Sequence, residues 1–528
     1  MMRSTFDPSP REERMVVLHE PAHEMRPRVV LDNPPQEQLR RLTLQMPNAK
    51  RTAYGSVDVF TSVDSRSSGS TYIVTETPEE YRGHQTMPRA EYEEITRLQE
   101  EYIAGRPMIV IDGYISNAKE VQTAARLVIE RANANVAGMQ KFLYFERADG
   151  DPQVTVIDTP NLAAPGYPND RCIAVDLENG VTRVLNSDYF GESKKGGLRM
   201  WNKIVYDKGG LPMHAGCKVI PTAQGEKTIV VIGLSGTGKT TTTFRRQGDS
   251  KAVQDDFIAL MRGGKVYGTE NGCFAKTFSL SPEHEPEIYR AVTSPIAYLE
   301  NVYLSEDGTP DFFNESFTQN GRAVFHLEAL GRYEDANNIG PVNAIVILNR
   351  ARSVVPALAK LSEQQAAAYF MLGETQGTSA GGKDEAGKSL RVPGTNPFFP
   401  LPNELQGNRF LELLRTHPID VYLMNTGWIV DDSGPDSKKV TVEHSSACMR
   451  AIAEGGLEWF TDPDFGYQLP VRVPGIAPED EDLLQPRERF EALGRLDDYR
   501  SWVERLKAER RACLESFPGL DGYIRAGV

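Results

Sequence analysis

Residues 233–240 carry the pattern with the most specific chemical meaning in this chain. They read Gly-Leu-Ser-Gly-Thr-Gly-Lys-Thr and match the phosphate-binding motif G-x-x-x-x-G-K-[ST] in full. Glycines let consecutive backbone N–H groups turn onto phosphate oxygens, and Lys239 places a positive charge at the β- and γ-phosphates. Thr240 offers its hydroxyl to a divalent metal ion. The sequence therefore predicts a site for a nucleoside triphosphate at this loop.

Two adjacent carboxylates, Asp255 and Asp256, follow this loop inside the apolar segment 252–260. This segment is predicted to be one strand, in which neighbouring side chains point to opposite faces. Only one of the two carboxylates is then expected to face the nucleotide. The favoured interpretation is a metal-binding acid that works with the phosphate loop. The alternative is a strand end with solvated aspartates.

Composition limits the classes of protein to consider. The chain has 528 residues, enough for two or three domains, with 59 basic and 73 acidic residues and a net charge of −14. Such a charge repels phosphate backbones, so no nucleic-acid partner is expected. The five cysteines are scattered and form no metal or disulfide pattern. No apolar segment is long enough for a membrane span or signal peptide, so we expect no membrane association and a cytoplasmic location.

The elements that must position these residues follow from hydrophobic periodicity. Short apolar runs predict strands at 108–115, 141–146, 227–234, 252–260, 343–349 and 420–428. Helical spacing predicts helices at 118–140, 362–371, 407–416 and 445–454, with surface helices beyond residue 477. This mixture of strands and helices predicts an α/β (mixed α+β) fold. The pattern of apolar and polar residues changes near residue 220, which predicts a domain boundary there.

The segment 376–396 is rich in glycine and has no apolar periodicity. Loops of this length inside a compact domain are usually lids or linkers. We expect a lid that closes over bound nucleotide and substrate and excludes water.

Several ordered segments together resemble the ATP-dependent phosphoenolpyruvate carboxykinase family. The phosphate loop is followed by Thr-Thr-Thr, and YFGESKKG precedes a Met-His pair. The matching segments are 66–74, 189–196, 213–214, 233–243, 270–289, 319–322 and 422–428. The resemblance spans roughly residues 55–475 and implies a two-domain fold, with a substrate-binding domain at 1–220 and a nucleotide-binding domain at 221–528.

The resemblance also implies roles for individual residues. Arg66 and Tyr189 would hold the substrate carboxylates and the departing carbon dioxide. Lys195, His214 and Asp256 would ligate a manganese ion, and Ser235 and Lys276 would lie near the reacting groups. ATP and its magnesium ion would be surrounded by Gly233, Leu234, Ser235, Gly236, Thr237, Gly238, Lys239, Thr240, Thr241, Glu285 and Arg322. Lys439 and Ser445 stand where the family has an arginine and a threonine beside the adenine.

The chain departs from the family pattern in several places. Phe257 and Ile258 follow the two aspartates where the family has glutamate and histidine. Residues 350–354 read Arg-Ala-Arg-Ser-Val in place of Asp-Ala-Phe-Gly-Val, and 397–408 differ from the usual small-residue segment. These changes bear on the lid, the nucleotide preference and the identity of the acid substrate.

The implied reaction converts oxaloacetate and ATP into phosphoenolpyruvate, carbon dioxide and ADP, in gluconeogenesis or in reverse. Loss of carbon dioxide creates the nucleophile, so no general base is needed. One alternative is a kinase on the same scaffold that phosphorylates another small acid or hydroxyl compound, which would need a base. Another is an ATP-binding regulator without turnover. The sequence leaves the oligomeric state open.

Overall fold

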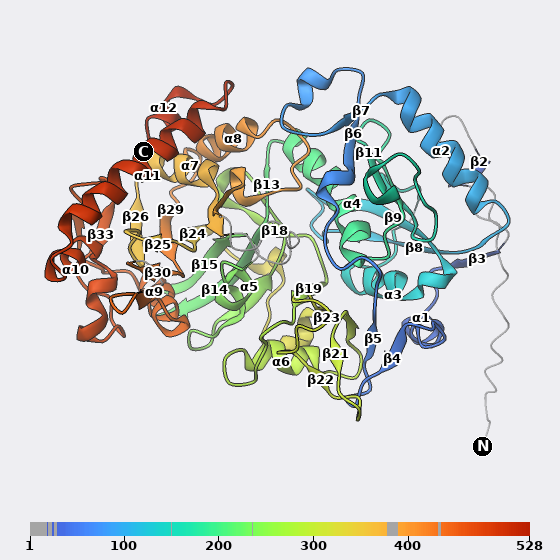
Figure 1. Ribbon diagram of the computed structural model, residues 1–528, viewed down its shortest axis with the longest axis horizontal. Helices are drawn as coiled ribbons and strands as arrows, with labels where there is room; N and C mark the ends of the chain where they lie inside the picture. Colours follow the sequence, from blue (N-terminus) through green and yellow to red (C-terminus); the bar gives the residue numbers. More distant parts are fainter. Residues whose placement is uncertain are drawn as a thin grey trace.

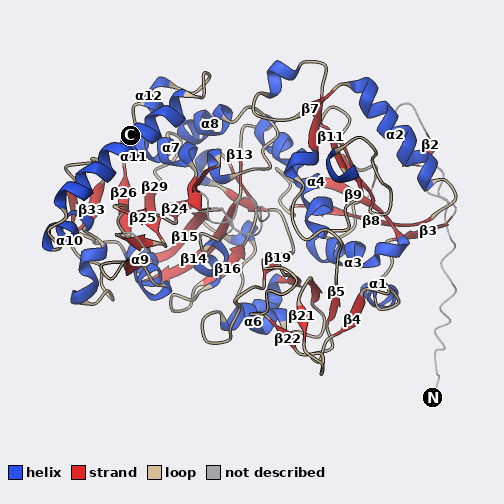
Figure 2. Cartoon of the chain, in the orientation of Figure 1, coloured by secondary structure: helices blue, strands red, loops and turns tan. Residues whose placement is uncertain are grey.

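The computed structural model describes residues 18–19, 24–25, 29–148, 150–234, 236–376, 389–430 and 434–528. Figure 1 places the N-terminal part of the chain on the right and the C-terminal part on the left, with a smaller sheet below and between them. Both parts contain helices as well as strands, as Figure 2 shows. The predicted mixed α/β fold class is confirmed.

The N-terminal part is built on an eight-stranded mixed sheet of order β3-β8-β9-β10-β12-β11-β6-β7. Its strands are β3 (Val29–Asp32), β6 (Thr71–Val74), β7 (Thr86–Met87), β8 (Pro107–Ile115), β9 (Thr123–Glu130), β10 (Val154–Thr159), β11 (Cys172–Asp176) and β12 (Val181–Leu185). The associated helices are α1 (Gln36–Thr43), α2 (Arg89–Ile103), α3 (Ala134–Leu143) and α4 (Phe190–Asp207). Helix α4 packs on β10 and β12, and most of its residues are buried.

The C-terminal part contains a second eight-stranded sheet, of order β16-β14-β15-β24-β29-β26-β33-β32. Its strands are β14 (Ala215–Thr222), β15 (Gly225–Ile232), β16 (Lys251–Gln254), β24 (Val342–Asn349), β26 (Leu358–Leu361), β29 (Asp420–Asn425), β32 (Trp459–Thr461) and β33 (Gln468–Pro470). The central strands β15, β24 and β29 are parallel and read as nearly continuous apolar runs, as strands covered on both faces do.

Helices flank this sheet along most of the C-terminal sequence. They are α5 (Lys239–Phe244), α7 (Glu363–Leu372), α8 (Glu404–Leu414), α9 (Val442–Glu454), α10 (Pro486–Ala492), α11 (Leu496–Glu515) and α12 (Gly522–Arg525). Among the described residues, no helix is both long and apolar enough to cross a membrane.

Smaller sheets join distant parts of the sequence. The five-stranded sheet β19-β23-β20-β5-β4 combines β4 (Ala49–Arg51) and β5 (Val57–Val59) with β19 (Gly272–Lys276), β20 (Tyr298–Glu300) and β23 (Arg322–His326), and α6 (Pro286–Val292) packs beside β23. A three-stranded sheet contains β13 (Leu211–Met213), β17 (Ile258–Leu260) and β18 (Val266–Gly268). The remaining short strands are β1 (Leu18–His19), β2 (Glu24–Met25), β21 (Tyr303–Leu304), β22 (Pro310–Asp311), β25 (Arg352–Ser353), β27 (Glu374–Gln376), β28 (Ser389–Arg391), β30 (Trp428–Ile429) and β31 (Lys438–Lys439).

The strands predicted at 108–115, 227–234 and 343–349 correspond to β8, β15 and β24, and the predicted C-terminal helices to α7, α8 and α9. The helix predicted over 118–140 is wrong over most of its length, because residues 123–130 form strand β9, and only its end from residue 134 lies in α3. The strand predicted over 141–146 is also wrong, because α3 continues to Leu143. Both elements are buried almost throughout, so their apolar residues carry no one-sided periodicity.

The domain boundary near residue 220 stays a prediction. That position lies inside β14, which pairs with both β15 and β16 of the C-terminal sheet. Strand β5, which pairs with β4, also pairs with β20, so an early segment of the chain shares a sheet with a much later one.

Lys218 of β14 holds the far end of helix α5, which follows the phosphate loop. Its buried Nζ donates to the carbonyls of Thr242 (3.2 Å) and Arg245 (2.6 Å) and to Gln247 Oε1 (2.6 Å). We expect Lys218→Met to lower the free energy of unfolding by roughly 2–4 kcal/mol, because three acceptors in the protein interior lose the donor that they share. Urea denaturation measures the change. Lys251→Met, which removes a partly exposed ion pair with Glu334, should cost less than about 1 kcal/mol. Equal losses in the two variants would contradict this role for Lys218.

Candidate active site

The loop predicted to bind phosphate connects β15 to α5. Gly236 and Gly238 have φ angles of 86° and 88°, a region that residues with a side chain rarely adopt. A Cβ on Gly233 would approach Thr237 Oγ1 to 2.4 Å. The glycines are thus required by the backbone path, which supports the interpretation of the motif. Ser235 lies outside the described residues.

Residues from three other segments hold the loop in place. Thr426, after β29, donates its hydroxyl to the Thr237 carbonyl (2.8 Å), and Arg350, after β24, donates to the Gly236 carbonyl (2.6 Å). Thr241 Oγ1 donates to Glu285 Oε1 (2.5 Å), so the structure brings these two predicted nucleotide-site residues together. The loop is therefore braced by the carboxyl ends of the neighbouring parallel strands, where ligands bind in open α/β sheets.

Both adjacent aspartates face the loop. Thr240 Oγ1 lies 3.3 Å from Asp255 Oδ2, and Lys239 Nζ lies 3.3 Å from Asp256 Oδ1. The prediction that only one carboxylate would face the nucleotide is wrong. The single strand predicted over 252–260 is interrupted between β16 and β17, so strand alternation does not apply to these two residues.

Asp256 also joins the loop to a cluster of nitrogen donors. Its Oδ2 accepts from Lys195 Nζ (2.5 Å) and Lys194 Nζ (2.6 Å), both on α4. Its Oδ1 lies 2.9 Å from Nε2 of His214, between β13 and β14. The structure thus brings together Lys195, His214 and Asp256, which the resemblance had implied as manganese ligands.

The surroundings of this cluster set its protonation states. Burial lowers the pKa of Lys195 to about 7, despite the nearby Asp256 carboxylate. The pKa of Lys194 is raised: burial opposes the shift, but the carboxylates of Asp256 and Glu270 outweigh it. The pKa of Asp256 is held well below its ordinary value, against the effect of burial, by the Lys194, Lys195 and Lys239 ammoniums. One lysine of the pair is therefore a permanent cation, and the other is able to become a neutral amine.

His214 is oriented for metal ligation. Its Nδ1 lies 3.0 Å from the Thr395 carbonyl, which only accepts hydrogen bonds, so Nδ1 carries the proton. Burial lowers the pKa of His214 to about 4, so the ring is neutral near pH 7. Nε2 then points a lone pair at the carboxylate of Asp256. Two acceptors facing each other next to an amine fit a bound cation, and the mixed N/O set suits manganese better than magnesium.

A second cation position lies beside Thr240. The Asp255 Oδ1 atom is buried and has no hydrogen-bond partner among the described residues. Its other oxygen contacts the Thr240 hydroxyl. A hydroxyl and an unsatisfied carboxylate next to a phosphate loop fit Mg²⁺, which prefers oxygen ligands. Asp255 therefore joins Thr240 as a candidate ligand that the sequence interpretation had not assigned.

The residues implied for substrate and phosphate contact lie on the side of the five-stranded sheet. Asn320 donates to the Tyr189 hydroxyl (3.3 Å) and accepts from Arg322 Nη2 (2.8 Å). Lys276 on β19 pairs in register with Arg322 on β23. Burial, followed by the charges of Arg322 and Arg350, lowers the pKa of Lys276 to about 8. Of these cations, Arg350 contacts the phosphate loop through the Gly236 carbonyl, and Lys276 lies close enough to feel its charge.

The other predicted residues lie at the edges of this region. Arg66 precedes β6 and lines a pocket described below. Lys439 on β31 is exposed, with its Nζ 5.6 Å from the Trp428 ring, and the Ser445 hydroxyl donates to Thr441 within the first turn of α9. Of the predicted lid at 376–396, residues 377–388 lie outside the described residues. The end of that segment is described, and its Thr395 carbonyl contacts His214.

Sequence reasoning did not assign Glu270, Asn320 or Thr395. Glu270 and Asn320 lie within the matching segments 270–289 and 319–322, so the family resemblance covered these two residues but implied no role for them. Thr395 acts through its backbone carbonyl, for which the sequence carries no signal.

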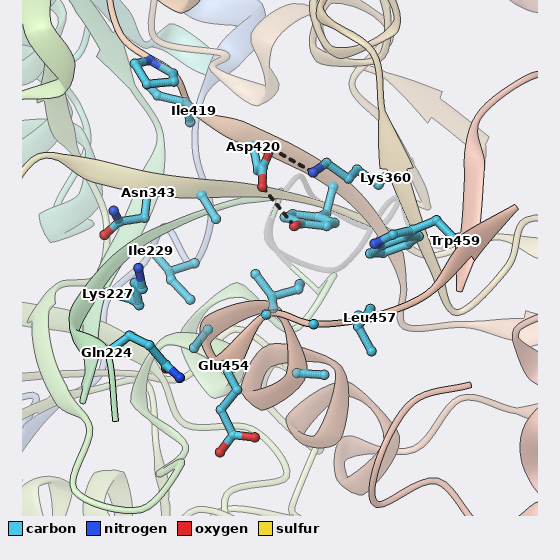
Figure 3. A pocket seen from close by; sticks show the side chains of 18 residues that line it. Gln224, Lys227, Ile229, Asn343, Lys360, Ile419, Asp420, Glu454, Leu457 and Trp459 are labelled. Carbon is cyan, nitrogen blue, oxygen red and sulfur yellow. Dashed lines mark hydrogen bonds and ion pairs between the residues drawn. The ribbon is translucent and has the colours of Figure 1, made fainter. Parts of the chain in front are cut away.

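A larger pocket of about 500 Å³ lies at the opposite ends of the same parallel strands. Lys227, Asn343 and Asp420 mark the beginnings of β15, β24 and β29 on its wall, and Figure 3 shows Asp420 in contact with Lys360. The phosphate loop follows the other end of β15. This pocket therefore does not belong to the site built around Asp256.

The family model for phosphoenolpyruvate carboxykinase matches residues 28–479 of the chain. A protein of Rhodopseudomonas palustris strain BisB5, named phosphoenolpyruvate carboxykinase (ATP), is 31% identical over 427 residues, which cover 78% of this chain and 78% of the relative. The chain belongs to the ATP-dependent phosphoenolpyruvate carboxykinase family. The resemblance inferred from the sequence motifs is confirmed.

Other relatives of the same name agree with this assignment. The protein of Aeropyrum pernix is 33% identical over 407 residues, covering 74% of this chain and 78% of the relative. The protein of Rhodopseudomonas palustris strain TIE-1 is 34% identical over 347 residues, covering 63% of each chain.

The departures from the carboxykinase pattern have a structural consequence at the cation cluster. Phe257, which replaces the family's glutamate, has its ring 4.7 Å from Lys195 Nζ and 5.1 Å from the His214 ring. Phe398, in the other divergent segment, also lies 4.7 Å from Lys195 Nζ. Two aromatic walls exclude water from the lysine, which favours its neutral form.

Arg350 replaces the family's aspartate and reaches the loop directly. We expect Arg350→Gln to weaken ATP binding about tenfold, or roughly 1.4 kcal/mol, because the loop loses a brace and the phosphates lose a nearby positive charge. Titration calorimetry with ATP measures the dissociation constant. Arg352→Gln, at an exposed position two residues further on, is the matched control and should change affinity less than about twofold. Unchanged ATP affinity in Arg350→Gln would show that this arginine is not part of the nucleotide site.

Proposed function

We propose that this chain converts oxaloacetate and ATP into phosphoenolpyruvate, carbon dioxide and ADP. The observation that carries the proposal is the position of Asp256, whose two oxygens contact Lys195 and His214 on one side and Lys239 of the phosphate loop on the other. One carboxylate thus connects a cation cluster suited to an enolate with a loop suited to a triphosphate. Decarboxylation and phosphoryl transfer need these two sites next to each other.

The chain's own residues have distinct tasks in this reaction. Arg66 and Tyr189 orient the carboxylates of oxaloacetate, and cleavage of the bond to the departing carboxylate leaves an enolate. The enolate oxygen then attacks the γ-phosphorus in line, and the bond to the ADP oxygen breaks. Lys239, Lys276 and Arg322 stabilise the charge that develops on the phosphoryl oxygens. No residue needs to remove a proton, because decarboxylation generates the nucleophile.

Two divalent ions complete the proposal, in keeping with a family that uses divalent metals. Lys195, His214 and Asp256 would hold Mn²⁺, and Thr240 with Asp255 would hold the Mg²⁺ of the nucleotide. When bound, Mn²⁺ supplies the positive charge that stabilises an enolate oxygen. The protein's contribution is to keep the Lys195 amine neutral and the His214 lone pair directed into the site.

The alternatives fit these observations less well. A kinase acting on a hydroxyl group needs a base, and Asp256, which contacts Lys239, has its pKa held well below the ordinary value. Burial raises the pKa of Asp255, but the Mg²⁺ proposal uses that carboxylate as a ligand. A regulator that only binds ATP has no use for a buried cluster of lysines, histidine and aspartate, whose desolvation is costly.

The direct test is to incubate the protein with oxaloacetate, Mn²⁺, Mg²⁺ and one phosphoryl donor, and to follow phosphoenolpyruvate by phosphorus NMR. ATP, GTP and pyrophosphate are compared as donors. Product with ATP, at a rate well above that with GTP or pyrophosphate, is the expected result. ATP hydrolysis or binding without phosphoenolpyruvate from any donor would overturn the proposal.

A further inference from the structure

A pocket of about 240 Å³ opens beside the cation cluster, and we call it the arginine pocket. Its polar wall includes Arg66, Thr71, His84, Gln85 and Arg199. Phe398 forms part of the apolar wall. The arginine pocket is small enough for one acid group with a short carbon chain and is built from β6, its flanking loops, α4 and the segment 397–400.

Arg199 is a buried arginine in the wall of the arginine pocket, and its hydrogen bonds are incomplete within the described part of the chain. It lies on α4, one helical turn after Lys195, and its side chain is only 7% exposed. Its Nη2 makes a long contact with Glu192 Oε2 (3.4 Å), while Nη1 is buried without a hydrogen-bond partner among the described residues. An unsatisfied guanidinium nitrogen next to a cavity is costly and is satisfied when an acceptor binds there.

The charges around the arginine pocket favour an anion. Among the described residues, its lining contains two guanidiniums, from Arg66 and Arg199, and no carboxylate. Burial lowers the pKa of His84, so its imidazole is neutral near pH 7. Glu192, which contacts Arg199 from outside this lining, also accepts from the backbone N–H of Ser67 (2.5 Å). Both charged side chains that line the pocket are therefore cationic, as a site for an anion requires.

Phe398 places the arginine pocket next to the reacting groups. The centre of its ring lies 4.7 Å from Lys195 Nζ and 5.5 Å from the Arg199 guanidinium carbon. An acid held at the cation cluster by one end thus has a second cationic site within reach of its other end.

We propose that Arg199 is a second binding residue for the acid substrate, and that with Arg66 it takes the carboxylate distant from the keto group. This inference rests on the proposed function and deepens it. Two planar guanidiniums hold a carboxylate through parallel hydrogen bonds, which select a dicarboxylic acid over a monocarboxylic one. Arg199 thereby becomes a specificity-determining residue for four-carbon dicarboxylates.

The test combines binding with kinetics. Succinate, a four-carbon dicarboxylate without a keto group, is titrated into the full-length protein by calorimetry, with butyrate as the monocarboxylate comparison. We expect wild-type protein to bind succinate more tightly than butyrate and Arg199→Met to lose succinate affinity about tenfold or more. Succinate should compete with oxaloacetate. In Arg199→Met the KM for oxaloacetate should rise by a similar factor while the KM for ATP stays within about twofold.

Two further variants serve as controls for this experiment. Arg199→Lys keeps the charge but not the planar fork, so intermediate succinate affinity is expected even if the methionine variant folds poorly. Arg82→Met, at an exposed arginine paired with Glu404 beside the pocket rim, should behave as wild type.

The outcomes separate this inference from the proposed function. Succinate binding that depends on Arg199, in a protein that makes no phosphoenolpyruvate, would retain the pocket as a dicarboxylate site and overturn the proposed reaction. Phosphoenolpyruvate formation with unchanged oxaloacetate KM in Arg199→Met would overturn the role of Arg199 alone. Succinate binding that does not compete with oxaloacetate would mean that the pocket takes a free anion, which also overturns the assignment to the substrate.

Discussion

Lys239→Met is expected to lower the rate of phosphoenolpyruvate formation by about 10³-fold or more. Lys239 is the loop lysine, its side chain is 8% exposed, and its Nζ lies 3.3 Å from Asp256 Oδ1. Methionine keeps the length of the stem but removes the charge that compensates the phosphates during transfer. Asp256 retains its ion pairs with Lys194 and Lys195, so the variant should still fold.

Phosphorus NMR of the reaction gives the rate, and thermal denaturation followed by circular dichroism verifies folding. Lys227→Met is the matched control, because Lys227 lies near the beginning of β15, the same strand that leads into the loop. The control should retain a rate close to wild type. A folded Lys239→Met protein with activity within about tenfold of wild type would show that this loop is not the phosphoryl-transfer site.

Lys195→Arg is expected to weaken Mn²⁺ binding by about 100-fold or more and to reduce phosphoenolpyruvate formation in parallel. A lysine amine ligates a metal only when neutral, and burial already lowers the pKa of Lys195 to about 7. A guanidinium stays protonated and offers no lone pair. Titration with Mn²⁺ followed by electron paramagnetic resonance measures free metal directly and does not depend on turnover.

Lys194→Arg is the control variant that separates the loss of a metal ligand from a change in the charge around Asp256. Lys194 forms ion pairs with Asp256 and Glu270, and the pKa of Lys194 is raised by both carboxylates despite burial. Arginine keeps this charge, so Mn²⁺ affinity should fall less than about tenfold. If the two variants lose the same affinity, or if Lys195→Arg binds Mn²⁺ as wild type does, Lys195 is not a ligand.

The parts of the site that sequence reasoning predicted are those in which local chemistry is decisive. The phosphate loop is contiguous, and its glycines are required by the positive φ angles of Gly236 and Gly238. The ordered segments containing Tyr189, Lys195, His214 and Arg322 carried enough information to identify the family correctly. Residue type and spacing also predicted β8, β15 and β24.

Local pattern failed where elements are buried on all sides or interrupted by the site. Residues 118–146 contain a buried strand and a buried helix, so periodicity did not separate them. The break between β16 and β17 turned both Asp255 and Asp256 toward the loop, and no alternation rule describes such a break.

By itself, the sequence determined the chemical identity of the phosphate loop, the family and the mixed α/β class, because these depend on residue types at short spacing. Only the tertiary structure decided which distant groups share a charge environment. Three pairs of residues that lie together in the structure are far apart in the sequence: Glu270 and Lys194 by 76 residues, Thr395 and His214 by 181, and Arg199 and Arg66 by 133. Protonation and ligand binding depend on distances across a water-poor interior, and those distances arise only when the sheets and α4 pack together.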